Sequence, residues 1–333
     1  MQVVKQDNSS TIDVPHTHRP GRHCGSSAIR DLLEFHGLNL TEAFCFGLGA
    51  GLGITYVEIP DTATPFIVHV RSMGFEERVF STLGVPFRWE TWQDKSAAAD
   101  ALDNHLEAGR PALLLTDIYH LPYFKSSTHF PGHAIVAWKH ARDKMSVLVS
   151  DTERPGLIEV PHSKLSEARF SLSPPFIHHG SLFAPEYIDV QVSAEKVRNA
   201  ILNNAQSLKQ GNQKKGIEAL TTWKQDLPRW KAFEKWPWLL RFAYQVIEKR
   251  GTGGSGFRAM YSEFLDESSG ILPEIKNMGL VVLMRRSATA WSYLADCLRE
   301  GSESETFPEK KIGEAIEYVR EAELRYVNAA LEL

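Results

Sequence analysis

The first 190 residues or so alternate short apolar runs with amphipathic patterns. Runs rich in β-branched and aromatic residues predict strands, because these side chains suit a pleated, half-buried surface. Between the runs, apolar residues recur at three- and four-residue spacing, which predicts helices. The expected strands are 54–59, 66–70, 85–91, 111–117, 133–139 and 145–151, and the expected helices are 25–36, 41–48, 73–83 and 95–108.

The rest of the chain has a different pattern. From about residue 193 the strand signals stop, and helical patterns interrupted by Gly, Pro and Ser continue to the end. Ser193 is a residue type favoured as a helix N-cap, which predicts a helix start there. We therefore expect two domains, an α+β domain over 1–190 and an all-helical domain over 191–333. The clearest flexible joint, 251–256, lies inside the helical half.

Composition narrows the class of protein. Of the 333 residues, 43% are hydrophobic and 23% are charged, which is typical of globular proteins. The formal net charge of −4 gives nucleic acid and anionic membranes no electrostatic reason to bind. No stretch resembles a membrane span or, at the start, a secretory signal. Three scattered cysteines predict neither a disulfide framework nor a zinc cluster, so we expect a cytoplasmic protein with reduced thiols.

Cys24 lies at the boundary between a polar loop and an amphipathic pattern that predicts a helix. The pattern that starts at Gly25 places Cys24 at the N-terminal edge of a helix, where unpaired N–H groups and the helix dipole favour negative charge. A thiol there has a lowered pKa and becomes a better nucleophile. Gly25 would leave room for a substrate carbonyl. The alternative is a small buried apolar residue, which is what we expect of Cys45 and Cys297.

A thiolate nucleophile needs a base and a group that orients the base. His133 opens one expected strand and Asp151 closes the next. Two antiparallel strands joined by a short turn bring their outer ends together, so these two side chains are expected to be neighbours. Asp151 would accept from one ring nitrogen of His133, and the other would take the Cys24 proton. This order of parts resembles that of papain-like enzymes.

Other histidines compete for a role. His18 precedes Cys24 by six positions, about where papain-like enzymes place an oxyanion-hole side chain, and His23 is a second candidate donor. A loop or substrate-binding role for His18 is the alternative. His129 and His133 have the spacing of a helical metal pair, but the Pro-Gly between them makes a helix implausible. We expect neither a metal site nor a cofactor.

Several strings of residues together resemble a known family. They are H-x-x-G-x-x-C-x-S-x-A at 18–28, GLGAGLG at 47–53, D-x-Y-x-L-x-Y at 117–123 and G-H at 132–133. Over roughly 14–190 the chain resembles the N-terminal domain of the butirosin biosynthesis protein H family. The resemblance implies a papain-like fold with a central antiparallel sheet and a triad of Cys24, His133 and Asp151. The remainder is similar to the uncharacterised domain that usually follows.

The glycine-rich string at 47–53 also resembles a phosphate-binding loop. It lacks the Lys-Ser/Thr of a P-loop and does not follow an expected strand. We therefore predict a tight, closely packed connection between a helix and a strand.

The family resemblance implies an acyltransferase that forms an acyl-enzyme at Cys24. The donor would be a thioester of an acyl carrier protein or of coenzyme A, and the acceptor a small-molecule amine. Asp117, Tyr119 and Tyr123 could line the acceptor pocket, although a structural loop is the alternative. The helical domain could complete that pocket, dock a carrier or form a homodimer. A cysteine peptidase or amidase with the same triad, and a non-catalytic scaffold, are the competing functions.

Overall fold

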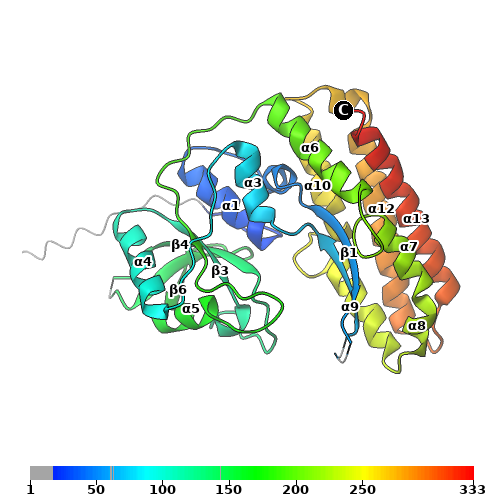
Figure 1. Cartoon of the computed structure of the whole chain (residues 1–333), viewed down its shortest axis with the longest axis horizontal. Helices are drawn as coiled ribbons and strands as arrows, with labels where there is room; N and C mark the ends of the chain where they lie inside the picture. The colour runs from blue at the N-terminus through cyan, green and yellow to red at the C-terminus, as the bar shows by residue number, and fades with distance from the viewer. Residues whose placement is uncertain (1–17, 61, 63, 143) are drawn as a thin grey trace, which may run out of the picture. The chain divides into compact units, whose positions relative to one another are not determined.

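The computed structural model describes residues 18–60, 62, 64–142 and 144–333 (Figure 1). The first residues, on which the expectation about a secretory signal rests, lie outside these ranges. The first part of the described chain is α+β, and the part from α6 (Ala194–Lys209) onward is mostly helical. The predicted fold class is confirmed at this level. Within the described residues, no helix combines the length and apolar character needed to cross a bilayer.

Two compact units interleave along the chain. The sheet unit comprises the described part of Met1–Pro20, together with Asp31–Leu38 and Arg88–Ile188. The helical unit comprises Gly21–Arg30, Asn39–Phe87 and Asp189–Leu333. Helix α1 (Cys24–Phe35) therefore begins in the helical unit and ends in the sheet unit. The domain boundary expected near residue 190 stays a prediction.

A five-stranded antiparallel sheet forms the centre of the sheet unit. Its strand order is β6-β5-β4-β3-β7. The central strands are buried along nearly their whole length, which explains why their sequences are continuous apolar runs rather than alternating ones. The strands are β3 (Ala112–Thr116), β4 (His133–His140), β5 (Ser146–Ser150), β6 (Ile158–Pro161) and β7 (Leu182–Phe183), and helices α4 (Lys95–Glu107) and α5 (His162–Arg169) pack against them.

One predicted strand is wrong. Residues 85–91 belong to no strand and form a single isolated bridge, between Glu90 and Leu182. Pro86 has no N–H to contribute to a ladder, which favours this outcome. Strands β6 and β7 were not predicted, because strands this short contain too few alternating positions to be recognised.

The helical unit also contains a two-stranded antiparallel sheet. Strand β1 (Leu52–Glu58) pairs with β2 (Phe66–Arg71), in which buried and half-buried residues alternate. The two longest helices, α12 (Leu280–Ser302) and α13 (Glu309–Ala330), run side by side (Figure 1). The remaining elements are α2 (Glu42–Leu48), α3 (Phe75–Leu83), α7 (Glu218–Gln225), α8 (Leu227–Ala232), α9 (Trp236–Glu248), α10 (Arg258–Ser268) and α11 (Glu274–Asn277), with short 3₁₀ turns at Ile118–His120 in the sheet unit and Ser255–Phe257 here.

An ion pair lies in the core of the helical unit. Arg258 Nε donates to Glu323 Oε1 over 2.8 Å, and neither side chain is exposed. Ser287 and Trp291 donate to the same oxygen over 2.6 and 2.8 Å. Burial alone would raise the pKa of Glu323, but Arg258 and these hydrogen bonds hold that pKa below its usual range. Glu323 Oε1 thus accepts three hydrogen bonds, which offset part of the cost of burying the pair, whereas Oε2 has no hydrogen-bond partner among the described residues.

The glycine-rich string at 47–53 connects α2 to β1 at close quarters. A Cβ atom on Gly47 would lie 2.0 Å from the Phe264 ring, and one on Gly53 would lie 2.4 Å from the carbonyl oxygen of Arg71. No side chain fits at such distances, so these positions require glycine. The predicted close-packed connection between helix and strand is confirmed.

Candidate active site

Cys24 is the first residue of α1, as the sequence predicts. Its side chain is partly exposed, whereas Cys45 and Cys297 are buried. The residue before it caps the helix, because His23 Nδ1 accepts the backbone N–H of Ser26 over 3.1 Å. Cys24 therefore lies in the first helical turn, where backbone N–H groups lack intrahelical acceptors. Of the three thiols, it is the one within reach of solvent.

Glu42 fixes the loop that leads to Cys24. Its Oε1 atom accepts the backbone N–H groups of Arg22 and His23 over 2.8 and 2.7 Å. The Glu42 side chain is buried, so these hydrogen bonds compensate for the loss of water around the carboxylate. Sequence reasoning missed this residue. A glutamate after Thr41 fits an ordinary helix start, and nothing local links it to a loop twenty positions earlier.

The segment before Cys24 also contacts the C-terminal part of the helical unit. Arg22 forms two hydrogen bonds with the Glu263 carboxylate of α10, over 2.8 and 2.6 Å. The ring of His23 meets that of Phe257 edge to face, with 5.2 Å between centroids. The side chain of Arg22 also covers Gly253, a residue of the joint expected at 251–256. Residues more than 200 positions apart thus position the nucleophile candidate.

His23 and Gly25, both predicted to serve substrate, are closely packed. His23 is buried, with Nδ1 near the hydroxyl of Ser26 at 3.0 Å and Nε2 at 3.2 Å from Arg71 Nη1. A Cβ atom on Gly25 would lie 2.8 Å from Glu76 Oε1. The space beside Gly25 is therefore filled by side chains of α3 and by the ring of His23, and is not open on that side. An oxyanion role for His23 would require its present contacts to break.

The predicted hairpin brings His133 and Asp151 together. β4 pairs with β5 in antiparallel fashion, with Val136 opposite Ser150. His133 Nε2 lies 2.9 Å from each carboxylate oxygen of Asp151, and both side chains are more than 90% buried. Burial alone would raise the pKa of Asp151, but the charge and hydrogen bond of His133 and two further hydrogen bonds lower it. The carboxylate form of Asp151 is thus the favoured one beside the imidazole.

Tyr123 supports the same carboxylate. Its hydroxyl donates to Asp151 Oδ2 over 2.6 Å, and the backbone N–H of Thr152 donates to Oδ1 over 2.6 Å. Arg154 donates to the carbonyl oxygen of Tyr123 and lies 5.6 Å above its ring. Tyr123 was predicted to line an acceptor pocket, and its contact with Asp151 was missed. Only the tertiary structure brings the two residues together.

His18 has an oxygen partner on each side of its ring. Nδ1 lies 2.5 Å from Asp31 Oδ2, and Nε2 lies 2.7 Å from the carbonyl oxygen of Arg154. The side chain is also buried. The predicted oxyanion role would require one of these hydrogen bonds to break.

Asp117 and Tyr119 behave as parts of a structural loop. Asp117 is fully buried and accepts from the Ser171 hydroxyl, His129 Nδ1 and two backbone N–H groups. These hydrogen bonds from Ser171 and His129 outweigh the effect of burial and lower the pKa of Asp117. Tyr119 is exposed and stacks on His129, with 4.0 Å between centroids. Their placement in an acceptor pocket stays a prediction.

Two family models match the chain. Residues 23–152 match the model described as butirosin biosynthesis protein H, N-terminal, and residues 163–330 match a domain of unknown function (DUF4872). The chain belongs to the family with these two domains in this order. The butirosin biosynthesis protein H domain includes Cys24, His133 and Asp151, whereas His18 precedes the matched range. No curated protein matches the chain.

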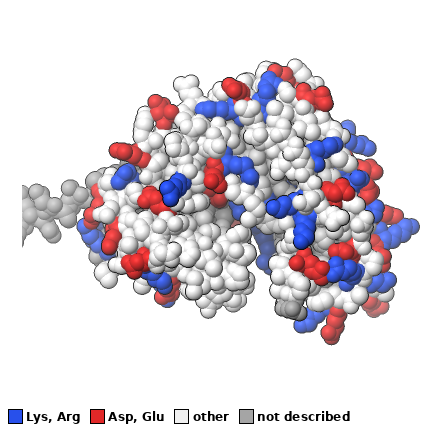
Figure 2. Space-filling view, viewed as in Figure 1, with Lys and Arg blue, Asp and Glu red and all other residues white. Residues whose placement is uncertain are grey.

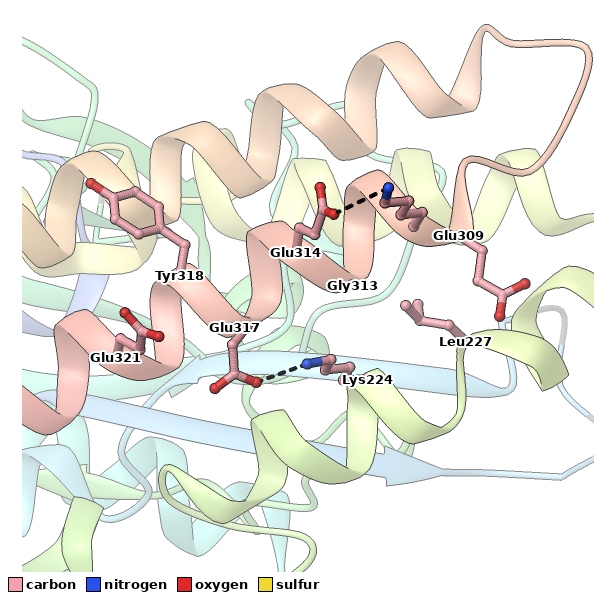
Figure 3. Close-up of a pocket in the computed structure, with 9 residues that line it drawn as sticks. Lys224, Leu227, Glu309, Gly313, Glu314, Glu317, Tyr318 and Glu321 are labelled. Atoms are coloured by element: carbon pink, nitrogen blue, oxygen red, sulfur yellow. Dashed lines mark hydrogen bonds and ion pairs between the residues drawn. The ribbon is translucent and has the colours of Figure 1, made fainter.

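The DUF4872 domain carries an open groove along α13, bordered by α7 and α8 (Figure 3). Lys224 pairs with Glu317 across it over 2.9 Å, and Glu309, Glu314 and Glu321 line the same helix. On the face drawn in Figure 2, acidic and basic side chains are interspersed rather than gathered by sign. The described residues that line the groove include no cysteine, so we do not assign a thiol-dependent reaction to it.

Proposed function

We propose that the protein is a cysteine-dependent acyltransferase, in which Cys24 takes an acyl group from a thioester and passes it to an amine. The contact between His133 Nε2 and both oxygens of Asp151 carries the proposal. In the proposed reaction this pairing orients the imidazole through Nε2, and Nδ1 acts as the base. The partly exposed position of Cys24 at a helix N-terminus supplies the nucleophile.

In the first step, Nδ1 of His133 takes the proton from the Cys24 thiol. The thiolate attacks the thioester carbonyl, and the backbone N–H groups at the start of α1 stabilise the oxyanion. The bond from sulfur to the acyl carbon forms, the bond to the donor thiol breaks, and the donor thiol takes the proton from His133. In the second step an amine attacks the acyl-enzyme, and its proton returns to Cys24 through His133.

The donor is proposed to be an acyl carrier protein or coenzyme A thioester, and the acceptor a small-molecule amine. The DUF4872 domain is proposed to help build the site. Arg22 and His23 directly precede Cys24 in the chain. The proposal rests on the pairing of Arg22 with Glu263 and on the contact of His23 with Phe257.

Intact-protein mass spectrometry tests the proposal. The protein is incubated with a set of acyl thioesters, with and without an amine, beside the Cys24→Ala variant. We expect an acyl adduct on the wild type alone, and its conversion to an amide when the amine is present. An adduct that decays to the free acid at the same rate with and without amine would identify a hydrolase. A set of thioesters that leaves no adduct on either protein would contradict the proposal.

A further inference from the structure

A second cluster of chemically active side chains lies in the sheet unit, at the end of β4 opposite His133. His140 is the last residue of β4, His162 is the first of α5, and Asp103 lies on α4. Asp103 Oδ1 is 3.8 Å from His140 Nε2 and 3.8 Å from His162 Nδ1. The ligand-type atoms of the three residues lie within 4.8 Å of one another. We propose that these residues bind a divalent transition-metal ion, with zinc as the preferred one.

The main support is a carboxylate oxygen that faces two imidazole nitrogens but makes no hydrogen bond in the part of the chain that the structure describes. Asp103 Oδ1 is buried and makes no hydrogen bond within the described residues, and the same is true of His140 Nδ1. A distance of 3.8 Å is too long for a hydrogen bond. The Asp103 side chain is 39% exposed, so water reaches the carboxylate, but a shielded oxygen without a hydrogen bond still calls for an explanation, such as an ion. A metal ion between Asp103 and the two imidazoles would satisfy that oxygen.

In a comparable cluster of the same unit, the carboxylate already accepts several hydrogen bonds. Asp117, His120 and His129 also lie within ligand reach of one another. There, Asp117 already accepts from the Ser171 hydroxyl and from His129 Nδ1 over 2.6 and 2.7 Å, and from two backbone N–H groups. Its lone pairs are used, so an ion would have to displace existing hydrogen bonds. Asp103 Oδ1, by contrast, accepts no hydrogen bond within the described residues.

The donor set and geometry suit zinc. Two imidazole nitrogens and one carboxylate oxygen are ligands that zinc accepts, with bonds of about 2.0–2.2 Å and a tetrahedral arrangement. Ligand atoms in that arrangement are about 3.4 Å apart. Asp103 Oδ1 lies 3.8 Å from each imidazole nitrogen, so the ligands would have to move closer together on binding. A water molecule would complete the coordination. Asp103 and His162 are partly exposed, which gives an ion access from solvent.

The ion would act as a structural tie rather than in the reaction. His140 follows His133 by seven positions on one strand, which is about 23 Å at the rise of an extended chain. The three ligands belong to α4, β4 and α5, so binding joins two helices to the central sheet. Two features are expected to limit the affinity of the site for the metal ion. His140 Nδ1 lacks the outer hydrogen bond that usually strengthens a histidine ligand. In addition, Arg169 lies close enough for its charge to offset that of Asp103.

Metal titration of the full-length protein tests the site. After treatment with a chelator, the Cys24→Ala protein, which lacks the accessible thiol, is titrated with Zn²⁺ by calorimetry and with Co²⁺ by visible absorption. We expect one equivalent of zinc, a rise in Tm on zinc addition, and the strong visible band of four-coordinate cobalt. The Asp103→Asn and His162→Gln variants should lose all three, and the control His120→Gln, from the cluster around Asp117, should keep them.

Two results would overturn the site. One is the absence of zinc uptake and of a cobalt band in the Cys24→Ala protein, which decides the matter without a ligand variant. The other is uptake that remains at one equivalent in both Asp103→Asn and His162→Gln. Circular dichroism of the metal-free variants shows whether each is folded, and a loss of uptake in an unfolded variant does not support the site.

Discussion

His133 Nε2 lies 2.9 Å from both carboxylate oxygens of Asp151, although the two residues are 18 positions apart in the chain. The register of the β4–β5 hairpin produces this contact, because the strands run in opposite directions and their outer ends meet. The imidazole is held by the Asp151 carboxylate through Nε2, and Nδ1 is the nitrogen that the proposed reaction would use.

Replacing Asp151 is expected to impair acyl transfer strongly. Asp151→Asn keeps the size of the side chain but removes the charge that favours protonated His133, so we expect the rate to fall by about 10²- to 10⁴-fold. Tyr123→Phe removes one hydrogen bond to the same carboxylate and is expected to cost about 10-fold. Formation of the acyl-enzyme in single turnovers measures both effects. Equal rates for Asp151→Asn and wild type would exclude this pair from catalysis.

Cys24 is expected to be alkylated much faster than the other two cysteines. Cys24 is partly exposed, whereas Cys45 and Cys297 are buried, and burial raises the pKa of the Cys297 thiol. Timed treatment with iodoacetamide near neutral pH, followed by peptide mapping, gives the three rates in one experiment. Cys45 and Cys297 serve as internal controls. A rate for Cys24 no higher than that of a model thiol would argue against an activated nucleophile.

Stability is expected to depend on the protonation of His69. Burial and the neighbouring charge of Arg71 lower the pKa of His69 to about 4, against about 6.5 for an ordinary histidine. The unfolded chain therefore takes up a proton below pH 6.5 while the folded chain stays neutral down to about 4. This lowers the free energy of unfolding as pH falls across that interval.

Urea unfolding at several pH values between 7 and about 4 measures the effect of His69. The His69→Gln variant cannot take up the proton, so its stability should fall less steeply than that of the wild type. Other groups titrate in the same range, and the difference between the two proteins isolates His69. A difference that stays constant with pH would contradict the prediction.

Removing Glu323 is expected to destabilise the helical unit severely. Glu323→Ala leaves Arg258 buried without its ion partner, which costs about 3–5 kcal/mol in the free energy of unfolding. Glu314 forms an exposed pair with Lys310, so Glu314→Ala is expected to cost at most about 1 kcal/mol. Urea or thermal unfolding of both variants gives the comparison. Similar losses in the free energy of unfolding of the two variants would show that burial does not determine how much the ion pair with Arg258 contributes to stability.

The sequence by itself determined the local structure and the candidate residues. The spacing of Ile29, Leu32 and Leu33 placed Cys24 at the start of α1, and the runs at 133–139 and 145–151 predicted the hairpin that joins His133 to Asp151. These features depend on side-chain periodicity and on short connections, which a single sequence displays directly.

Only the tertiary structure decided which distant residues support those candidates. Tyr123 reaches Asp151, Glu42 holds the loop before Cys24, and Glu263 pairs with Arg22 across 241 positions. It also gave His18 two acceptors, and brought Asp103 to His140 and His162 although no motif connects them. Contacts of this kind depend on how whole elements pack, and no local pattern in the chain encodes which surfaces will meet.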